Sequence, residues 1–153
     1  MSGSRKVIFD TDPGIDDAMA LLFAHLSPAI ELVGVTTVLG NGSIETVTRN
    51  ALYLCERFDI NAGVYQGAAA PLLVNSDEPP AFVHGDDGLG NINAAKPLTN
   101  AGDLSAAEFI VNTVLAQPHE ITLIAVGRLT NLAMALRMNP AIAPLVKEVI
   151  VMG

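Results

Sequence analysis

Four aspartates lie within eight residues near the start of the chain, at Asp10, Asp12, Asp16 and Asp17. No basic residue lies among them, and an apolar run follows at once. Carboxylates this close raise one another's pKa unless a cation lies between them. Oxygen ligands without histidine or cysteine suit a hard cation, Ca²⁺ or Mg²⁺. Segment 10–17 therefore predicts a metal site, and the residues alone leave the choice between the two ions open.

A purely structural role would explain only part of this acidic segment. Asp16 could cap a helix and Asp17 could lie in its first turn, where a carboxylate gains about 0.3–1 kcal/mol from the helix dipole. Asp10 and Asp12 would remain unexplained. The pair Pro13–Gly14 predicts a tight turn that holds Asp12 and Asp17 toward one point, which favours the metal site.

The elements that must position these aspartates alternate between strands and helices. Short apolar runs predict strands at 6–10, 30–38, 62–67, 120–126 and 146–152. Apolar segments of helix-forming residues, two of them opened by Ser43 and Ser105 as caps, predict helices at 16–26, 43–58, 105–117 and 129–138. Continuous apolar strands alternating with helices are typical of an α/β fold with a mostly parallel, Rossmann-like sheet and helices on both faces. Ligands of such folds bind beyond the carboxyl ends of the strands.

Two further features concern the organisation of the chain. Residues 68–102 are rich in Pro, Gly, Asn and Asp and predict a long functional loop. We expect residues 1–5 to be a leader or cloning remnant, and residues 6–153 to be the N-terminal part of a single domain. Because Gly153 directly follows an apolar strand that no helix covers, we expect a truncated sheet.

Composition narrows the classes of partner. The net charge is −8, which argues against nucleic acid and against an anionic membrane surface, since both need Lys and Arg. No apolar stretch approaches the roughly 20 residues of a membrane span. The single cysteine, Cys55, excludes an internal disulfide and falls at an apolar helical position. We therefore expect a cytoplasmic protein with an inert core thiol and a neutral, cationic or metal ligand.

Two enzyme families place an aspartate pair after the first strand. The run "VIFDTD" (7–12) would open a haloacid dehalogenase-like phosphatase, with Asp10 as nucleophile, Asp12 as acid/base and Mg²⁺ bound. That family has Thr or Val two places after the second aspartate, where this chain has Gly14. Its further acidic pair lies far downstream rather than four residues on. This phosphatase is the weaker alternative.

The segment "DTDPGIDDA" (10–18) resembles the signature of the inosine–uridine-preferring nucleoside hydrolases almost letter for letter. The resemblance continues in family order through "TTVLGN" (36–41), "TRNA" (48–51), "HGDDGLG" (84–90), "GRLTNLAMAL" (127–136) and "KEVIVMG" (147–153). It covers essentially the whole chain after the leader. One departure is Arg128 in "GRLTN", where a smaller residue or Pro is expected.

The resemblance implies hydrolysis of the N-glycosidic bond of ribonucleosides to ribose and free base. It implies that Asp12 binds Ca²⁺ and acts as general base on a calcium-bound water, and that Asp17 and the main-chain carbonyl of Val126 also bind Ca²⁺. Asp16 and Asn41 would contact the ribose. The transition state resembles an oxocarbenium ion, whose positive charge an acidic pocket stabilises.

For two other residues the resemblance implies looser roles. Asp10 would orient the turn from outside the ligand set, and His84 would lie in a loop that closes over the substrate or meets the leaving base. A lone loop histidine is as often merely solvated, and that alternative stays open.

The family resemblance also implies purine and pyrimidine nucleoside salvage and a homo-oligomer, dimer or tetramer. Family members are about twice this length, and their distal half supplies further site residues. We therefore expect this chain alone to bind Ca²⁺ weakly and to turn over little. A non-catalytic remnant that only binds nucleoside or ribose is a second alternative. The base preference and the oligomeric state are left open by the sequence.

Overall fold

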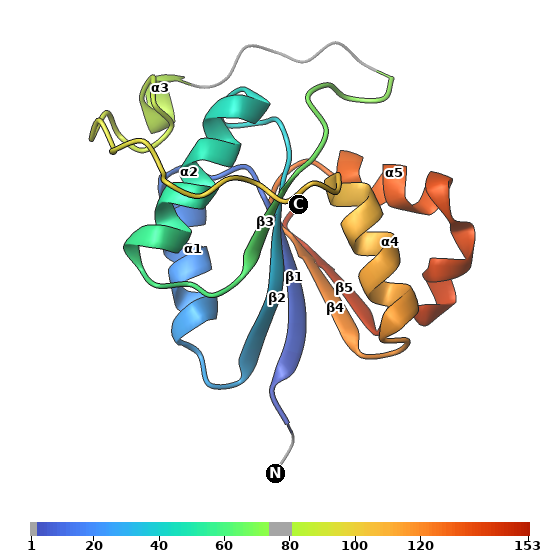
Figure 1. The fold of residues 1–153 in the computed structure, drawn as a ribbon. Helices are drawn as coiled ribbons and strands as arrows, with labels where there is room; N and C mark the ends of the chain where they lie inside the picture. The colour runs from blue at the N-terminus through green and yellow to red at the C-terminus, as the bar shows by residue number, and fades with distance from the viewer. Residues whose placement is uncertain (1–2, 74–80) are drawn as a thin grey trace.

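One parallel sheet organises the protein. The computed structural model describes residues 3–73 and 81–153, and within them five strands are joined in the order β3-β2-β1-β4-β5 (Figure 1). The strands are β1 (Arg5–Thr11), β2 (Ile30–Thr37), β3 (Gly63–Gln66), β4 (Ile121–Ala125) and β5 (Glu148–Val151). All four pairings are parallel. The predicted α/β class is confirmed.

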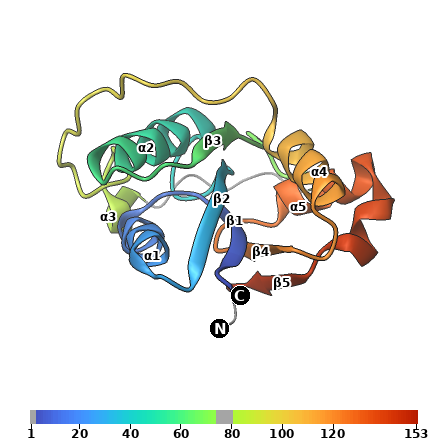
Figure 2. The ribbon, with the colours of Figure 1, turned by 60° about the horizontal axis from the view of Figure 1, so that its bottom comes forward.

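Helices cover both faces of this sheet. They are α1 (Ile15–Leu26), α2 (Ile44–Arg57), the short α3 (Ala81–His84), α4 (Ala106–Ala116), α5 (Thr130–Met138) and a 3₁₀ helix, η1 (Pro140–Leu145). Figure 2 shows α1 and α2 on one side of the strands and α4 and α5 on the other. Each helix connects two parallel strands, as crossover connections require.

The core lies on both sides of β1 because successive side chains of a strand point to opposite faces. Val7 and Phe9 pack with residues of α1, α2 and β3. Ile8 packs with residues of α4, β4 and α5 on the other face. All three side chains are buried. This burial on two faces explains why the strand reads as a continuous apolar run.

The predicted helix caps are confirmed. The Ser43 hydroxyl accepts from the Thr46 N–H at the start of α2. The Ser105 hydroxyl accepts from the Glu108 N–H, and the Glu108 carboxylate accepts from the Ser105 N–H, which completes a capping box at α4. Cys55 is buried on α2, and burial raises the pKa of its thiol to about 11, as expected of an inert core cysteine.

Among the differences from the sequence prediction, three concern the organisation of the chain. The region 68–102 contains the helix α3, although residues 74–80 lie outside the described part of the chain. The last strand begins at Glu148 rather than at 146, because the Pro-containing η1 occupies 140–145. The strand β1 already includes Arg5, a residue that we had assigned to the leader. Whether residues 1–5 are a leader stays a prediction.

The register brings the site segments to one edge of the sheet. Asp10 pairs with Thr36 of β2 on one side and with Ala125 of β4 on the other. The carboxyl ends of these three strands therefore meet, at the upper edge in Figure 1. Segments 10–17, 38–41 and 126–130 all leave the sheet at this edge.

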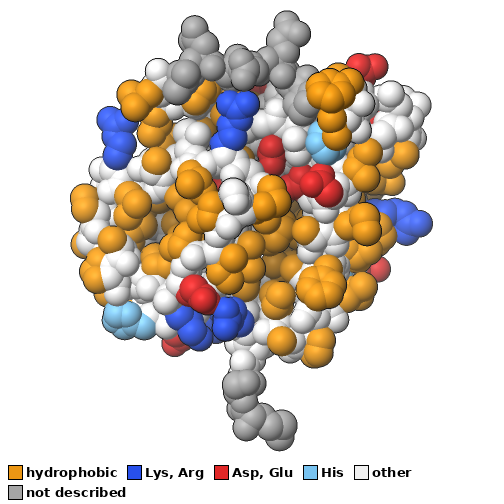
Figure 3. All heavy atoms as spheres, turned by 180° about the vertical axis from the view of Figure 1, so that it is seen from behind, with side chains coloured by type: hydrophobic (Ala, Val, Ile, Leu, Met, Phe, Trp, Pro, Cys, Tyr) orange, Lys and Arg blue, Asp and Glu red, His pale blue; other side chains and the backbone are white. Residues whose placement is uncertain are grey.

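One face of the molecule is apolar. Figure 3 shows hydrophobic side chains spread over this face, with acidic side chains and a histidine near its upper end. Exposed apolar side chains on α1 and near β5 include Met19, Phe23, Ile150 and Met152. No helix in the described ranges has the length and apolar character needed to cross a bilayer.

Candidate functional site

Asp10 is the buried anchor of the site. It ends β1 with only 1% of its surface exposed, and its Oδ1 accepts from Thr36 Oγ1 at 2.5 Å and from Asn131 Nδ2 at 2.7 Å. Asn131 also donates to the Thr37 carbonyl and accepts from the Ala68 N–H. One amide thus joins the ends of β1 and β2 to the segment after β3. The second carboxyl oxygen of Asp10 is buried without a hydrogen-bond partner in the described residues.

Asp12 and Asp17 are brought together by Asn41. The Asn41 N–H donates to Asp12 Oδ2 at 2.9 Å, and Asn41 Nδ2 donates to the Asp12 carbonyl at 3.1 Å and to Asp17 Oδ2 at 3.0 Å. Asp17 also accepts from Thr11 Oγ1 at 2.7 Å and from the Gly14 N–H at 3.2 Å. Both carboxylates are buried. The predicted convergence of Asp12 and Asp17 is therefore present.

Two glycines make room for the Asp12 carboxylate. A Cβ on Gly40 would lie 1.9 Å from Asp12 Oδ2, and a Cβ on Gly127 would lie 2.7 Å from Asp12 Oδ1. The Val126–Gly127 peptide is consequently a neighbour of that carboxylate. Val126 is fixed in turn by its N–H, which donates to the Asp10 carbonyl at 2.9 Å. A side chain at either glycine would displace Asp12.

Burial shifts the titration of three aspartates in the same direction. Burial, and after it the charge of Asp17, raise the pKa of Asp12 to about 7. Burial raises the pKa of Asp10 to about 6 against the opposing hydrogen bonds from Asn131 and Thr36. Burial raises the pKa of Asp17 too. Burial disfavours the ionised forms of these three carboxylates. Such a cluster is suited to binding a proton or a cation.

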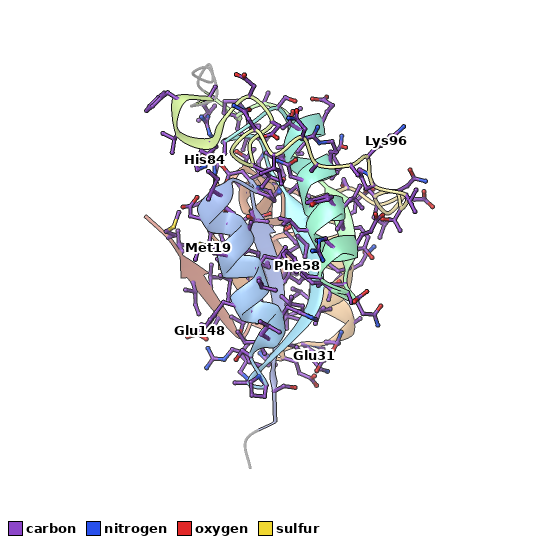
Figure 4. The ribbon with its side chains drawn as sticks, turned by 90° about the vertical axis from the view of Figure 1, so that its left-hand side faces the viewer. Met19, Glu31, Phe58, His84, Lys96 and Glu148 are labelled. Carbon is purple, nitrogen blue, oxygen red and sulfur yellow. The ribbon has the colours of Figure 1, made fainter. Side chains whose placement is uncertain are left out.

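Asp16 and His84 lie at the rim. The helix α1 begins at Ile15 with Gly14 as its N-cap, so Asp16 lies inside the first turn and the alternative in which Asp16 caps the helix is wrong. Its side chain is 73% exposed and lies 3.9 Å from His84 Nδ1. His84 is 8% exposed and accepts from the Ile15 N–H at 3.3 Å. Figure 4 places His84 above the N-terminal end of α1.

The predicted site residues lie at different depths. Asp10 lies beneath the site, Asp12 and Asp17 line it, and Asp16 faces solvent. In residues 3–73 and 81–153, no group of three or more His, Cys, Asp or Glu side chains is arranged to hold a metal ion. A cation here would rely on two carboxylates and on main-chain oxygen.

Two buried amides were missed by the sequence analysis. Asn131 holds Asp10, and Asn50 of α2 donates to the carbonyls of Pro13 and Asp87. Both amides are at most 1% exposed. The available signal was a polar residue on the apolar face of a helix, since Asn50 lies between buried Val47 and Leu54 positions.

The chain is similar to a known protein family over nearly its whole length. The family model of the inosine-uridine preferring nucleoside hydrolases matches residues 7–153. The chain belongs to this family. The family match includes all of the segments that meet at the carboxyl edge of the sheet.

Two similar proteins are named as a nucleosidase and a ribonucleoside hydrolase. Over 149 residues the chain is 44% identical to the "Probable uridine nucleosidase 1" of rice (Oryza sativa subsp. japonica), covering 97% of this chain and 46% of that protein. Over 153 residues it is 40% identical to the "Pyrimidine-specific ribonucleoside hydrolase RihB" of Escherichia coli O157:H7, covering 97% and 47%.

Solved structures resemble the fold closely. The "Plant nucleoside hydrolase - PpNRh1 enzyme" aligns with a TM-score of 0.91 at 41% identity, covering 97% of this chain and 48% of that one. The "Purine-Preferring Ribonucleoside Hydrolase from Gardnerella vaginalis" aligns with a TM-score of 0.92 at 33% identity, with the same coverage. This chain spans about half the length of these relatives, 46–48%.

Proposed function

We propose that the protein serves in the hydrolysis of the N-glycosidic bond of ribonucleosides, giving ribose and a free base. The observation that carries this proposal is Asp12. Asp12 is 7% exposed, and its carboxylate is flanked by two glycines, Gly40 and Gly127. Its Oδ2 accepts the Asn41 N–H, and among the described residues its Oδ1 accepts no hydrogen bond, so Asp12 keeps an oxygen with which to take a proton from water.

The donor set supports a divalent cation at this site. Asp12, Asp17 and the Val126 carbonyl would hold it, and these are the hard oxygen ligands that Ca²⁺ prefers. Asp17's charge disfavours ionisation of Asp12, and a cation between them would remove that penalty. Three donors are fewer than the 6–8 oxygens that Ca²⁺ takes in proteins, so the fit is partial. We propose Ca²⁺ because the family resemblance implies it.

Asp12, Asp16 and Asn41 would have separate roles in the reaction. Asp12 would take a proton from the attacking water at its carboxylate, and a bound cation would make that water more acidic. Asp16, exposed at the rim, would accept hydrogen bonds from ribose hydroxyls. Both bonds of the Asn41 side chain use Nδ2, so its Oδ1 is the atom that would accept from the sugar.

Electrostatics at the edge favour the transition state. Cleavage builds positive charge on the ribose, as in other glycoside cleavages. A neutral nucleoside gains little from nearby carboxylates, whereas the cationic sugar gains much more, and this difference lowers the barrier. His84 stands at the rim beside Asp16. We propose that it meets the substrate from above.

Several properties of the whole protein remain proposals. The names of the rice and E. coli relatives make uridine the first substrate to test. A homo-oligomer is proposed from the family resemblance alone. Cytoplasmic placement and a role in nucleoside salvage rest on the sequence features alone.

The test has a binding part and a turnover part, because the chain spans only about half of its relatives. Calcium and ribose titrations of the chain itself, with and without chelator, measure binding. A chimaera in which residues 7–153 replace the matching part of the rice relative measures release of free ribose from uridine and inosine. Chelator-sensitive ribose release supports the proposal. Hydrolysis of a phosphomonoester but not of nucleosides would favour the phosphatase, and sugar binding without base release would favour the non-catalytic alternative.

A further inference from the structure

The motif "TRNA" (48–51) has no part in the proposed chemistry, yet its asparagine is fully buried. Asn50 is 0% exposed on α2, on the face that also buries Val47, Ala51 and Leu54. A buried amide among apolar side chains is unfavourable unless its donors and acceptor are satisfied. Its hydrogen bonds therefore show what holds it there.

Asn50 bridges two segments that are far apart in the sequence. Its Nδ2 donates to the Pro13 carbonyl at 3.2 Å and to the Asp87 carbonyl at 2.9 Å. Its Oδ1 accepts from Arg49 Nη2 at 2.9 Å. Pro13 belongs to the acidic turn, and Asp87 belongs to the segment that follows α3. The amide nitrogen thus ties the two segments to one point on α2.

A second contact joins the same two segments. His84, the last residue of α3, accepts from the Ile15 N–H at the start of α1. A Cβ on Gly88 would lie 2.8 Å from Asn50 Nδ2, so the segment packs directly on the amide. The segment 84–93 is consequently docked on the acidic turn from two sides, by His84 and by Asn50.

The segment 84–93 is shaped by its own hydrogen bonds but not placed by them. Asp87 accepts from the N–H groups of Leu89, Asn91 and Asn93, which folds the segment on itself. These bonds are all internal, so they fix its form and leave its position to external contacts. Asn50 and Arg49 supply those contacts from α2.

We propose that Asn50 is a positioning residue that fixes segment 84–93, with His84, over the acidic turn and so sets the affinity for the nucleoside. This inference rests on the proposed function, since it assigns the segment to the same site. Asn50 itself touches neither the sugar nor the cation. Its effect passes through Pro13 on one side and through Asp87 on the other.

The test compares substitutions of Asn50 with a control on the same helix. Asn50→Asp keeps the shape and loses the donor, and Asn50→Leu keeps the approximate volume and loses every hydrogen bond. In amide hydrogen exchange we expect residues 84–93 to exchange about fivefold to tenfold faster, the equilibrium equivalent of one neutral hydrogen bond. Uridine affinity of the chain should weaken by a similar factor, whereas exchange in β4 should not change.

Glu56→Gln is the matched control. Glu56 lies on α2 and accepts from the Leu98 and Thr99 N–H groups and from the Thr99 hydroxyl. Its substitution should speed exchange near 98–99 and leave 84–93 and uridine affinity unchanged. A general weakening of α2 would instead loosen both segments in every variant.

A second variant disrupts the contact between Asn50 and segment 84–93 by a change in the segment. Gly88→Ala adds a Cβ against Asn50 Nδ2 at a residue with φ of +77°, so it should release 84–93 even if the Asn50 variants fold poorly. Unchanged exchange of 84–93 in the folded Asn50 and Gly88 variants would overturn the proposal. So would release of the segment with full uridine affinity. If the rice chimaera releases no chelator-sensitive ribose from uridine, the proposed function fails, and with it the assignment of Asn50 to nucleoside affinity, whereas the exchange of 84–93 still tests the bridge itself.

Discussion

Two acidic segments of this protein use aspartate in opposite ways. Asp87, in segment 84–93, accepts from three backbone N–H groups. Partial burial opposes them, but these hydrogen bonds lower the pKa of Asp87. In segment 10–17, Asp12 has one such donor and burial raises its pKa to about 7. The Asp87 carboxylate holds the backbone N–H groups of its own segment. The Asp12 carboxylate keeps acceptor capacity for other partners.

The difference lies in the backbone around each carboxylate. Glycines at 85, 88 and 90 have positive φ and turn the chain so that its N–H groups point at Asp87. Gly40 and Gly127 instead clear space beside Asp12. The number of acids in a segment therefore does not identify a functional site, whereas buried carboxylates with few donors do.

The largest expected effect is on turnover. Asp12→Asn removes the proposed base and should lower the rate of ribose release in the rice chimaera about 10²–10⁴-fold. The thermal midpoint of the metal-free chain should stay or rise, because a buried carboxylate beside Asp17 is lost. A variant that keeps most of its activity would show that Asp12 is not the base.

The next effect concerns stability against pH. Because folding raises the pKa of Asp10 and Asp12 from 3.8 to about 6 and about 7, the folded chain binds more protons than the unfolded chain between these values. The free energy of unfolding without metal should therefore fall by about 2–4 kcal/mol from pH 5 to pH 8. Urea unfolding at several pH values measures this slope, and calcium should flatten it.

Asp17, whose pKa burial also raises, adds to this slope in the same direction. The remaining shifted carboxylates act at lower pH. Several groups have lowered pKa values, so their stabilisation is fully present above roughly pH 4–5 and is lost only at lower pH. These groups are Glu45, Glu56, Asp87, Glu108 and Glu120. Asp12→Asn is the control, because it should remove the larger part of the slope. A slope that survives in this variant would contradict the assignment.

Asp87→Ala should have a smaller effect, on the shape of segment 84–93. It removes the acceptor of three backbone N–H groups and should cost about 1–3 kcal/mol, as hydrogen bonds to charged groups do. Hydrogen exchange should show the loss at residues 85–93. Calcium affinity of the chain should stay unchanged, and a fall in that affinity would mean that the two acidic segments are not separate in role.

Asp16→Ala should change stability least. The side chain is 73% exposed in the first turn of α1, where the helix dipole contributes about 0.3–1 kcal/mol. Ribose affinity should fall, because this carboxylate is proposed to contact the sugar. Ser43→Ala offers a comparison, since it removes a cap of α2 away from the acidic turn. Equal ribose affinity in both variants would exclude Asp16 from the sugar site.

The sequence predicted the elements because local signals and burial agreed. The apolar runs of β1 and β4 are buried on both faces, and the caps at Ser43 and Ser105 are local hydrogen bonds. The helix η1 was missed because Pro140 and Pro144 weaken a helical pattern, although proline fits the first turn of a helix. The short α3 lies in a segment whose composition is typical of a loop.

For the candidate site, the sequence predicted the residue types and the convergence of Asp12 and Asp17, but no further geometry. The aspartates and Asn41 follow from the motifs, whereas the depth of each carboxylate does not. Asp16 and Asp17 are adjacent in the sequence, yet one faces solvent and the other is buried against Thr11. Asn50 and Asn131 were missed because their partners come from distant segments, and a single sequence does not reveal such pairs.

The central claim is that the acidic turn is built around a cation beside Asp12. It is tested most directly by following the carboxyl carbon of Asp12 by NMR through a pH titration, without and with calcium. The account predicts a pKa near 7 in the metal-free chain, as burial dictates, and a carboxylate that stays ionised well below this pH once calcium is bound. Titration near the ordinary value of 3.8, unaffected by calcium, would contradict it.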